Sequence, residues 1–221
     1  MGYVTKIRTS ARLAAIASAL CCAAATLVMA PQASAEPCND IEVVFARGTS
    51  EAPGIGRVGQ ALVDALIPLV GGRTVGAYGV IYPATYDFLT AADGATDATN
   101  FISSTAAACP STRFVLGGYS QGAAVIDLLA GIPPLGNKLG GEIAPPLPSS
   151  LAPNVAAVVV FGNPSTKFSV PITSSTFGGR ALDVCADGDP ICSDGRNPFA
   201  HTHYETSEFI PQAAGFVAGL V

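Results

Sequence analysis

Short apolar runs alternate along the chain with longer segments in which apolar residues recur at helical spacing. The short runs are almost continuously apolar and rich in β-branched residues, which is typical of strands that are covered on both faces. We predict five strands, at 41–46, 75–82, 113–116, 155–161 and 181–184.

The longer segments predict helices that cover a sheet. Apolar residues fall on one side of a helix in four segments, at 58–69, 88–106, 123–130 and 209–220. Strands and helices that alternate in this way predict an α/β fold. The expected architecture is a three-layer, doubly wound sandwich around a central, mostly parallel five-stranded sheet.

The order of the elements also predicts which loops carry chemistry. Ligands of such sheets bind at the carboxyl ends of the strands, so the strand-to-helix loops matter most. These are 47–56, 83–87, 118–120, 162–180 and the segment after Cys185. The Gly- and Pro-rich segment 131–153 follows a helix that runs away from this edge, so we expect it to lie far from the site.

The N-terminus has the features of a secretory signal peptide. Three basic residues precede an apolar run over 13–30, and Ala33-Ser34-Ala35 matches the small-x-small cleavage pattern. A membrane anchor is the alternative, but the run is Ala-rich and Pro31 follows it closely, so we expect no stable membrane insertion. The sequence therefore predicts a signal peptide over 1–35, one domain over 36–221, and a secreted, extracellular protein.

Charge narrows the possible partners. Cleavage after Ala35 removes three of the 11 Lys and Arg but none of the 16 Asp and Glu, which leaves a net charge of −8. Nucleic-acid binding needs clustered cations, so we expect no nucleic-acid partner.

Four cysteines remain after cleavage: Cys38, Cys109, Cys185 and Cys192. An even count in an exported chain predicts two disulfides. Cys38 precedes a strand and Cys109 ends a helix, which puts both at the amino edge of the sheet, whereas Cys185 ends a strand at the opposite edge. This geometry predicts the pairs Cys38–Cys109 and Cys185–Cys192. We expect no metal, because there is no C-x-x-C pair or His-rich tract.

The strongest motif is Gly-Tyr-Ser-Gln-Gly at 118–122. It follows a predicted strand and opens a predicted helix, which is the setting in which G-x-S-x-G presents a nucleophilic serine. An ordinary Gly-rich turn is the alternative. The context favours Ser120 as a nucleophile, with the helix amino end favouring developing negative charge.

A serine hydroxyl needs a base, and the chain has only two histidines, His201 and His203. Both follow the serine, as the chain order Ser, acid, His of α/β-hydrolases requires; two solvated loop histidines are the alternative. Candidates for the acid precede them. They are Asp183, Asp187, Asp189 and Asp194.

An oxyanion hole needs two backbone donors. Gln121, which follows the nucleophile, is one candidate, and the loop 47–51 supplies the other. The hydroxyl of Thr49 or Ser50 is a candidate third donor.

Four segments resemble the cutinase family of serine esterases. Residues 45–51 resemble its R-G-[ST]-x-E segment, and 118–122 reproduce its G-Y-S-Q-G elbow. Residues 185–192 resemble its C-x-x-x-D-x-x-C acid loop, and 201–204 its H-x-x-Y segment. The resemblance implies Ser120 as nucleophile, Asp189 as acid and His201 as base. It also implies Thr49 and Gln121 as the oxyanion pair.

The family likeness implies no metal or cofactor and agrees with the two disulfides. We expect a secreted serine esterase, acting as a monomer on ester or lipid substrates of short to medium acyl chains. Cutin-like polyesters, acylglycerols and phospholipids all remain open. The alternative is a non-catalytic secreted binding protein on the same fold.

Overall fold

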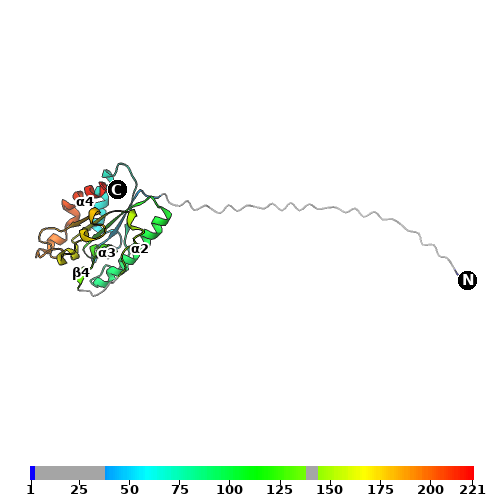
Figure 1. Cartoon of the computed structure of the whole chain (residues 1–221), viewed down its shortest axis with the longest axis horizontal. Helices are drawn as coiled ribbons and strands as arrows, with labels where there is room; N and C mark the ends of the chain where they lie inside the picture. The colour runs from blue at the N-terminus through cyan, green and yellow to red at the C-terminus, as the bar shows by residue number, and fades with distance from the viewer. Residues whose placement is uncertain (3–37, 138–143) are drawn as a thin grey trace. The chain divides into compact units, whose positions relative to one another are not determined.

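The computed structural model describes residues 1–2, 38–137 and 144–221 (Figure 1). Five strands form one sheet in the order β2-β1-β3-β5-β6, and every neighbouring pair is parallel. They are β1 Ile41–Ala46, β2 Val75–Gly79, β3 Arg113–Tyr119, β5 Val155–Phe161 and β6 Ala181–Val184. The predicted doubly wound sheet is confirmed.

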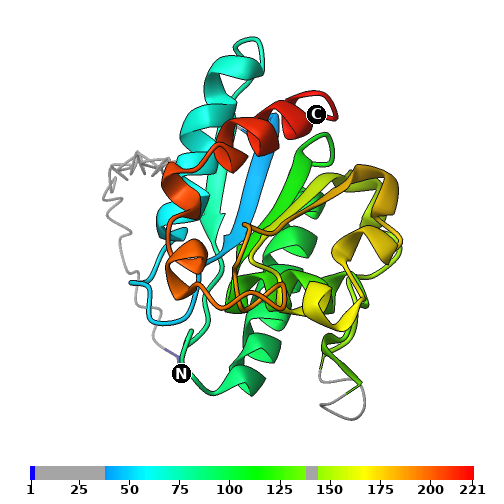
Figure 2. The same cartoon turned by 90° about the vertical axis from the view of Figure 1, so that its left-hand side faces the viewer.

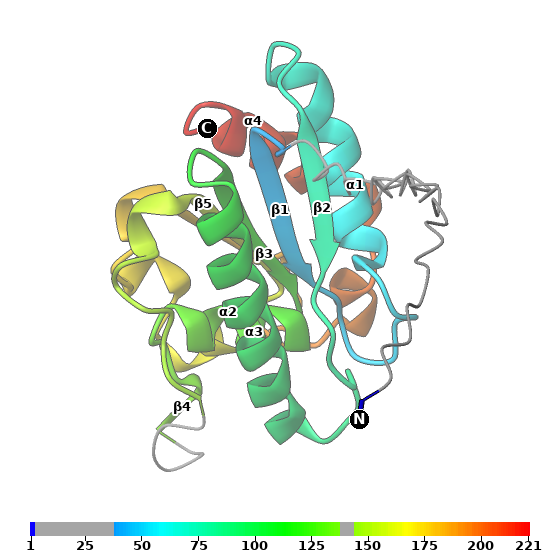
Figure 3. The ribbon, with the colours of Figure 1, turned by 90° about the vertical axis from the view of Figure 1, so that its right-hand side faces the viewer.

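Four helices cover the two faces of the sheet. They are α1 Gly56–Leu66, α2 Ala91–Ala108, α3 Gln121–Leu129 and α4 Phe209–Ala218. Two opposite views show α2 and α3 on one face and α1 and α4 on the other (Figures 2 and 3). This gives the three layers that the sequence predicts.

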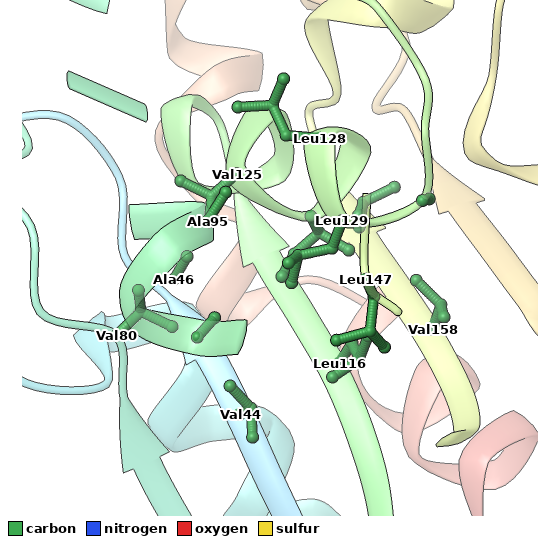
Figure 4. Close-up of a cluster of buried hydrophobic side chains, with 14 of the residues drawn as sticks. Val44, Ala46, Val80, Ala95, Leu116, Val125, Leu128, Leu129, Leu147 and Val158 are labelled. Carbon is green, nitrogen blue, oxygen red and sulfur yellow. The ribbon is translucent and has the colours of Figure 1, made fainter. Parts of the chain in front are cut away.

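The apolar runs place side chains in the cores on both faces of the sheet. Along β1, Val44 and Ala46 join the core beneath α2 and α3, whereas Val43 and Phe45 join the core beneath α1 and α4. Successive side chains of a strand point to opposite faces, so a strand that is covered on both faces is mostly apolar. Glu42 is the buried exception in β1, and its carboxylate accepts a hydrogen bond from Asn39. Figure 4 shows the first core, where Val44 of β1, Leu116 of β3 and helix α3 meet.

Strand and helix ends differ slightly from the prediction. Strand β2 ends at Gly79 rather than at residue 82, because the carbonyls of Val80 and Tyr82 accept hydrogen bonds from Arg47 instead of pairing in the sheet. Helix α2 begins at Ala91, after the 3₁₀ turn Phe88–Thr90. The other 3₁₀ turns are Ile67–Leu69, Ala152–Asn154, Pro164–Phe168, Ile172–Ser174, Gly178–Arg180, Pro198–His201 and Tyr204–Thr206.

One segment lies where the sequence did not predict it. The short strand β4, Pro134–Asn137, is outside the main sheet. Helix α3 has nine residues, a rise of about 13 Å, so it ends before it crosses the layer, and Gly131 at φ +71° turns the chain. The chain then returns to the edge toward which the strands point, where β4 lies (Figure 3). The expectation that 131–153 lies far from the site is wrong for this part.

Both disulfides have the expected partners. Cys38 is bonded to Cys109, which closes a separation of 71 residues, and Cys185 is bonded to Cys192 across seven. The first joins the entry to β1 with the end of α2. The second closes a small ring directly after β6.

Candidate active site

The sharp turn between β3 and α3 raises Ser120 to the edge of the sheet. Ser120 has φ +56° and ψ −118°, a strained conformation for a residue with a side chain. The two motif glycines make it possible, because a Cβ on Gly118 would clash with the carbonyl of Gly122, and one on Gly122 with that of Ala46. The turn is fixed by a hydrogen bond from Ser120 N to Phe161 O of 2.9 Å.

Three polar side chains from separate segments form a continuous line. The hydroxyl of Ser120 lies 2.8 Å from Nε2 of His201, and Nδ1 of the same ring lies 2.7 Å from Oδ2 of Asp189. With the proton on Nδ1, the ring donates to Asp189 and its free Nε2 accepts from Ser120. Such a ring can take the serine proton, and the carboxylate then stabilises the imidazolium.

Asp189 is completely buried but well supplied with donors. Its Oδ1 accepts from Ile191 N at 2.7 Å, and its Oδ2 also accepts from the hydroxyl of Tyr204 at 2.7 Å. Burial alone raises the pKa of Asp189, but the hydrogen bonds from His201, Tyr204 and Ile191 outweigh it and hold the pKa below its ordinary value. The carboxylate therefore stays ionised beside the imidazole.

The other candidates for base and acid lie elsewhere. His203 is exposed, and its Nδ1 faces Phe199 O at 2.9 Å. Asp187 and Asp194 are exposed loop residues. Asp183 belongs to a separate buried cluster, where Asn163, Thr166 and the backbone of Ile172 donate to it.

The loop after β1 reaches the same site. Thr49 and Gln121 both line the cleft that contains Ser120. The hydroxyl of Thr49 donates to Oε1 of Gln121 at 3.2 Å. Its proton therefore already has an acceptor, whereas a third donor of the oxyanion hole would direct this proton at the substrate oxygen. The side-chain amide of Gln121 in turn donates to Asp87 O at 3.2 Å.

Two charged residues that the sequence analysis did not single out hold this loop in place. The buried guanidinium of Arg47 donates to carbonyls of Glu51, Val80 and Tyr82. The carboxylate of Glu51 accepts from Gly48 N at 2.6 Å. Both belong to the R-G-[ST]-x-E segment, so the motif contained the signal, although its spacing does not reveal which contacts form.

A cleft of about 670 Å³ opens above Ser120. Each of the predicted strand-to-helix loops at the carboxyl ends of the strands contributes to this cleft. The walls of the cleft are mainly apolar and aromatic. The lining residues include Thr49, Tyr86, Phe88, Pro164, Phe168, Pro190, Ile191 and His201. Leu135 of β4 lines it as well, which is the contribution that the sequence did not predict.

A family model described as Cutinase matches residues 37–221. The chain belongs to the cutinase family. It is 50% identical over 205 residues to Phospholipase Culp4 of Mycobacterium tuberculosis, with 90% of this chain and 88% of that protein covered. It is 44% identical over 205 residues to Carboxylesterase Culp1 of the same species, with 87% and 88% covered.

Solved structures agree with this assignment. A Trichoderma reesei cutinase in complex with a phosphonate inhibitor is 36% identical, with a TM-score of 0.66 over 83% of this chain and 77% of that chain. An acetylxylan esterase is 26% identical, with a TM-score of 0.72 over 83% and 99%. This cutinase-family member has the α/β-hydrolase fold and is a carboxylic ester hydrolase rather than a non-catalytic binding protein.

Two features of the described residues bear on partners. Within the residues that the structure describes, none of the helices combines the length and apolarity needed to cross a membrane. In the same residues, no cluster of three His, Cys, Asp or Glu side chains is arranged to hold a metal ion.

Proposed function

We propose that this cutinase-family protein is a secreted serine esterase that uses Ser120, His201 and Asp189 as a catalytic triad. The observation that carries the proposal is the unbroken line of contacts from the Ser120 hydroxyl through both ring nitrogens of His201 to Asp189, at 2.8 and 2.7 Å. Among the candidate acids and the two histidines, only the buried Asp189 and the half-buried His201 take part in this line.

Acylation follows from this arrangement. The Oγ of Ser120 attacks the ester carbonyl carbon while its proton moves to Nε2 of His201. The carbonyl oxygen becomes an oxyanion, and the imidazolium is stabilised by Asp189. Collapse of the tetrahedral intermediate breaks the bond to the alcohol oxygen, which takes the proton from His201 as it leaves.

Deacylation repeats the same steps with water. His201 removes a proton from a water molecule that attacks the acyl-enzyme carbonyl, and the proton returns to Ser120 when the acid leaves. The backbone N–H groups of Thr49 and Gln121 are the proposed oxyanion donors in both halves. Each such donor contributes about 10²- to 10³-fold to kcat in serine hydrolases.

The cleft supports esters of short to medium acyl chains as substrates. Its apolar wall of Phe88, Leu135, Phe168 and Ile191 suits an acyl chain, and its volume of about 670 Å³ is that of a small-ligand site. The relatives carry the names phospholipase, carboxylesterase and cutinase. Phospholipids, acylglycerols and polyesters are thus the classes to compare.

Secretion is proposed from the N-terminal segment. Residues 1–35 have the basic start, the apolar run and the Ala33-Ser34-Ala35 site of a signal peptide. The two disulfides suit an oxidising compartment, since such bonds are rare in reducing ones. N-terminal sequencing of the exported protein tests the cleavage site, and a start at Glu36 is the expected result.

The nucleophile is tested by trapping. A p-nitrophenyl alkylphosphonate should inactivate the enzyme, and mass spectrometry of the digested protein should place the adduct on Ser120. Ser120→Ala should neither take the label nor hydrolyse p-nitrophenyl butyrate above about 10⁻³ of the wild-type rate. Exposed Ser104→Ala is the matched control. An adduct on another serine would overturn the proposal.

A further inference from the structure

The hydroxyl of Tyr204 makes two hydrogen bonds to oxygen and nitrogen partners deep in the site, and its oxygen also lies 3.7 Å from Sγ of Cys192. Tyr204 is 1% exposed, and its hydroxyl donates to Oδ2 of Asp189 at 2.7 Å and accepts from Ala186 N at 2.8 Å. The acceptor is the same oxygen that faces Nδ1 of His201 at 2.7 Å. Two donors therefore converge on one carboxylate oxygen, and only one of them belongs to the triad.

The surroundings keep this hydroxyl in one orientation. Burial raises the pKa of Tyr204, so the phenol keeps its proton at neutral pH. The N–H of Ala186 occupies a lone pair of the hydroxyl oxygen, which leaves the proton for Asp189. The ring is packed among Phe161, Tyr119 and Phe209, with centroids 5.9, 5.8 and 6.1 Å away.

We propose that Tyr204 is a positioning residue for ester hydrolysis, which fixes the Asp189 carboxylate against His201 and ties it to the backbone of the disulfide ring. Ala186 and Asp189 both lie inside the ring closed by Cys185 and Cys192, so the hydroxyl bridges the backbone of that ring to the side-chain carboxylate that the ring carries. Tyr204 does not line the cleft and acts through Asp189. The inference rests on the proposed triad.

Loss of this hydroxyl has two consequences that differ from loss of packing. The carboxylate loses one of the contacts that fix its angle, so the imidazole is held less accurately and kcat falls. The charge on Oδ2 also becomes less dispersed, so it attracts the imidazolium more strongly. The acid limb of the kcat/KM profile should then move to higher pH.

Tyr204→Phe removes only the oxygen. We expect kcat for p-nitrophenyl butyrate to fall about 10- to 100-fold, the range of one hydrogen bond to a charged group, with KM within about twofold. Tyr78→Phe is the matched control, because its hydroxyl also donates to a carboxylate, that of Asp97 at 3.0 Å, at the β2 edge. The control should keep the wild-type kcat and pH profile.

A double-mutant cycle with Asp189→Asn separates positioning from folding. If Tyr204 acts through the carboxylate, Tyr204→Phe should change kcat by less than about twofold in that background. An equal loss in both backgrounds, or an unmoved acid limb, would overturn the inference. If Asp189→Asn itself keeps full activity, the proposed triad fails instead.

A second variant covers the case in which Tyr204→Phe does not fold. Site-specific incorporation of 3-fluorotyrosine at position 204 keeps both the ring and the hydroxyl and makes the phenol a stronger donor. The acid limb should then move to lower pH, opposite to the shift in Tyr204→Phe. A profile identical to that of the wild type would contradict the role of the hydroxyl.

Discussion

The two histidines of the chain differ in what their ring nitrogens face. His201 lies between Ser120 and Asp189, whereas His203, two residues later, is exposed and faces a backbone carbonyl. The acid loop shows the same contrast between the buried Asp189 and its exposed neighbour Asp187. Spacing alone cannot separate such close neighbours, because the turn geometry decides which side chain points inward.

The first prediction separates these pairs. His201→Ala and Asp189→Asn should each lower kcat by about 10³-fold or more, because either change breaks the proton path. His203→Ala and Asp187→Asn, the matched controls, should stay within about tenfold of the wild type. Steady-state hydrolysis of p-nitrophenyl butyrate is the measurement. An essential His203 or Asp187 would reassign the base or the acid.

Between elements, the buried Asp127 of helix α3 and the partly buried Asp183 of strand β6 are joined through one asparagine. Asn163 Nδ2 donates to Asp127 Oδ1 and to Asp183 Oδ2, each at 3.1 Å. Burial raises the pKa of Asp127 well above its ordinary value, and it raises that of Asp183 as well. Asp127 therefore keeps its proton to higher pH in the folded protein than in the unfolded chain, and no step of the proposed reaction uses it.

The second prediction concerns stability and pH. A raised folded-state pKa means that the folded protein binds more protons than the unfolded chain, so stability falls as pH rises from about 4, the unfolded value, through the folded pKa. Asp127→Asn removes this contribution. In urea unfolding followed by circular dichroism, the loss of stability from pH 5 to pH 8 should be smaller in Asp127→Asn than in the wild type.

Exposed Asp93→Asn is the control for that comparison, because Asp93 lies in the first turn of α2 and keeps ordinary contact with water. It should show the same pH slope as the wild type. An unchanged slope in Asp127→Asn would mean that Asp127 is ionised in the folded protein.

The third prediction separates the two disulfides. Chain-entropy estimates give about 4 kcal/mol for closing the long Cys38–Cys109 loop and about 2.5 kcal/mol for the short ring, before strain. The short ring carries Asp189. Replacing Cys185 and Cys192 with Ser should thus cause the larger loss of kcat and the smaller loss of Tm of the two double variants. Replacing Cys38 and Cys109 with Ser should cause the larger loss of Tm and the smaller loss of kcat. Equal effects on kcat and Tm in both double variants would contradict these roles.

Most elements could be predicted because their local pattern and their final environment agree. The run 155–161 is apolar throughout and is buried on both faces, and the Gly residues around Ser120 mark a turn that needs them. The buried Asp127 gave no signal, since a lone acid in an apolar helix reads as surface. The return of Leu135 to the cleft depends on where α3 stops, which no single residue specifies.

Across the whole molecule, loops from distant parts of the sequence build the walls of one cleft. Leu135 of β4 and Phe168 of the turn Pro164–Phe168 lie on the same side, since a Cβ on Gly136 would come within 3.2 Å of Phe168. Phe168 belongs to the loop 162–180 that sheet topology selects, whereas Leu135 comes from the segment 131–153, which it does not select. Leu135 is an apolar side chain of this wall, and we expect it to affect which acyl chains fit.

The fourth prediction concerns this wall. Leu135→Ala should raise the ratio of kcat/KM for p-nitrophenyl decanoate over butyrate by roughly 3- to 10-fold, since it removes contact with a short chain and makes room for a long one. Exposed Leu69→Ala, on the turn Ile67–Leu69, is the control and should leave the ratio unchanged. An unchanged ratio in Leu135→Ala would place the acyl chain against another wall.

The last prediction concerns access to Ser120. A flap made of Phe168, Val170 and Ile172 would have to leave the core, because Ile172 is completely buried and its N–H donates to Asp183 at 3.0 Å. The segment 162–180 contains only short 3₁₀ turns and offers no amphipathic lid helix. We therefore expect hydrolysis of tributyrin to saturate smoothly through its solubility limit, as it should for fully soluble p-nitrophenyl acetate. A steep increase in rate where tributyrin begins to aggregate, absent with the acetate, would show that Ser120 is covered until an interface uncovers it.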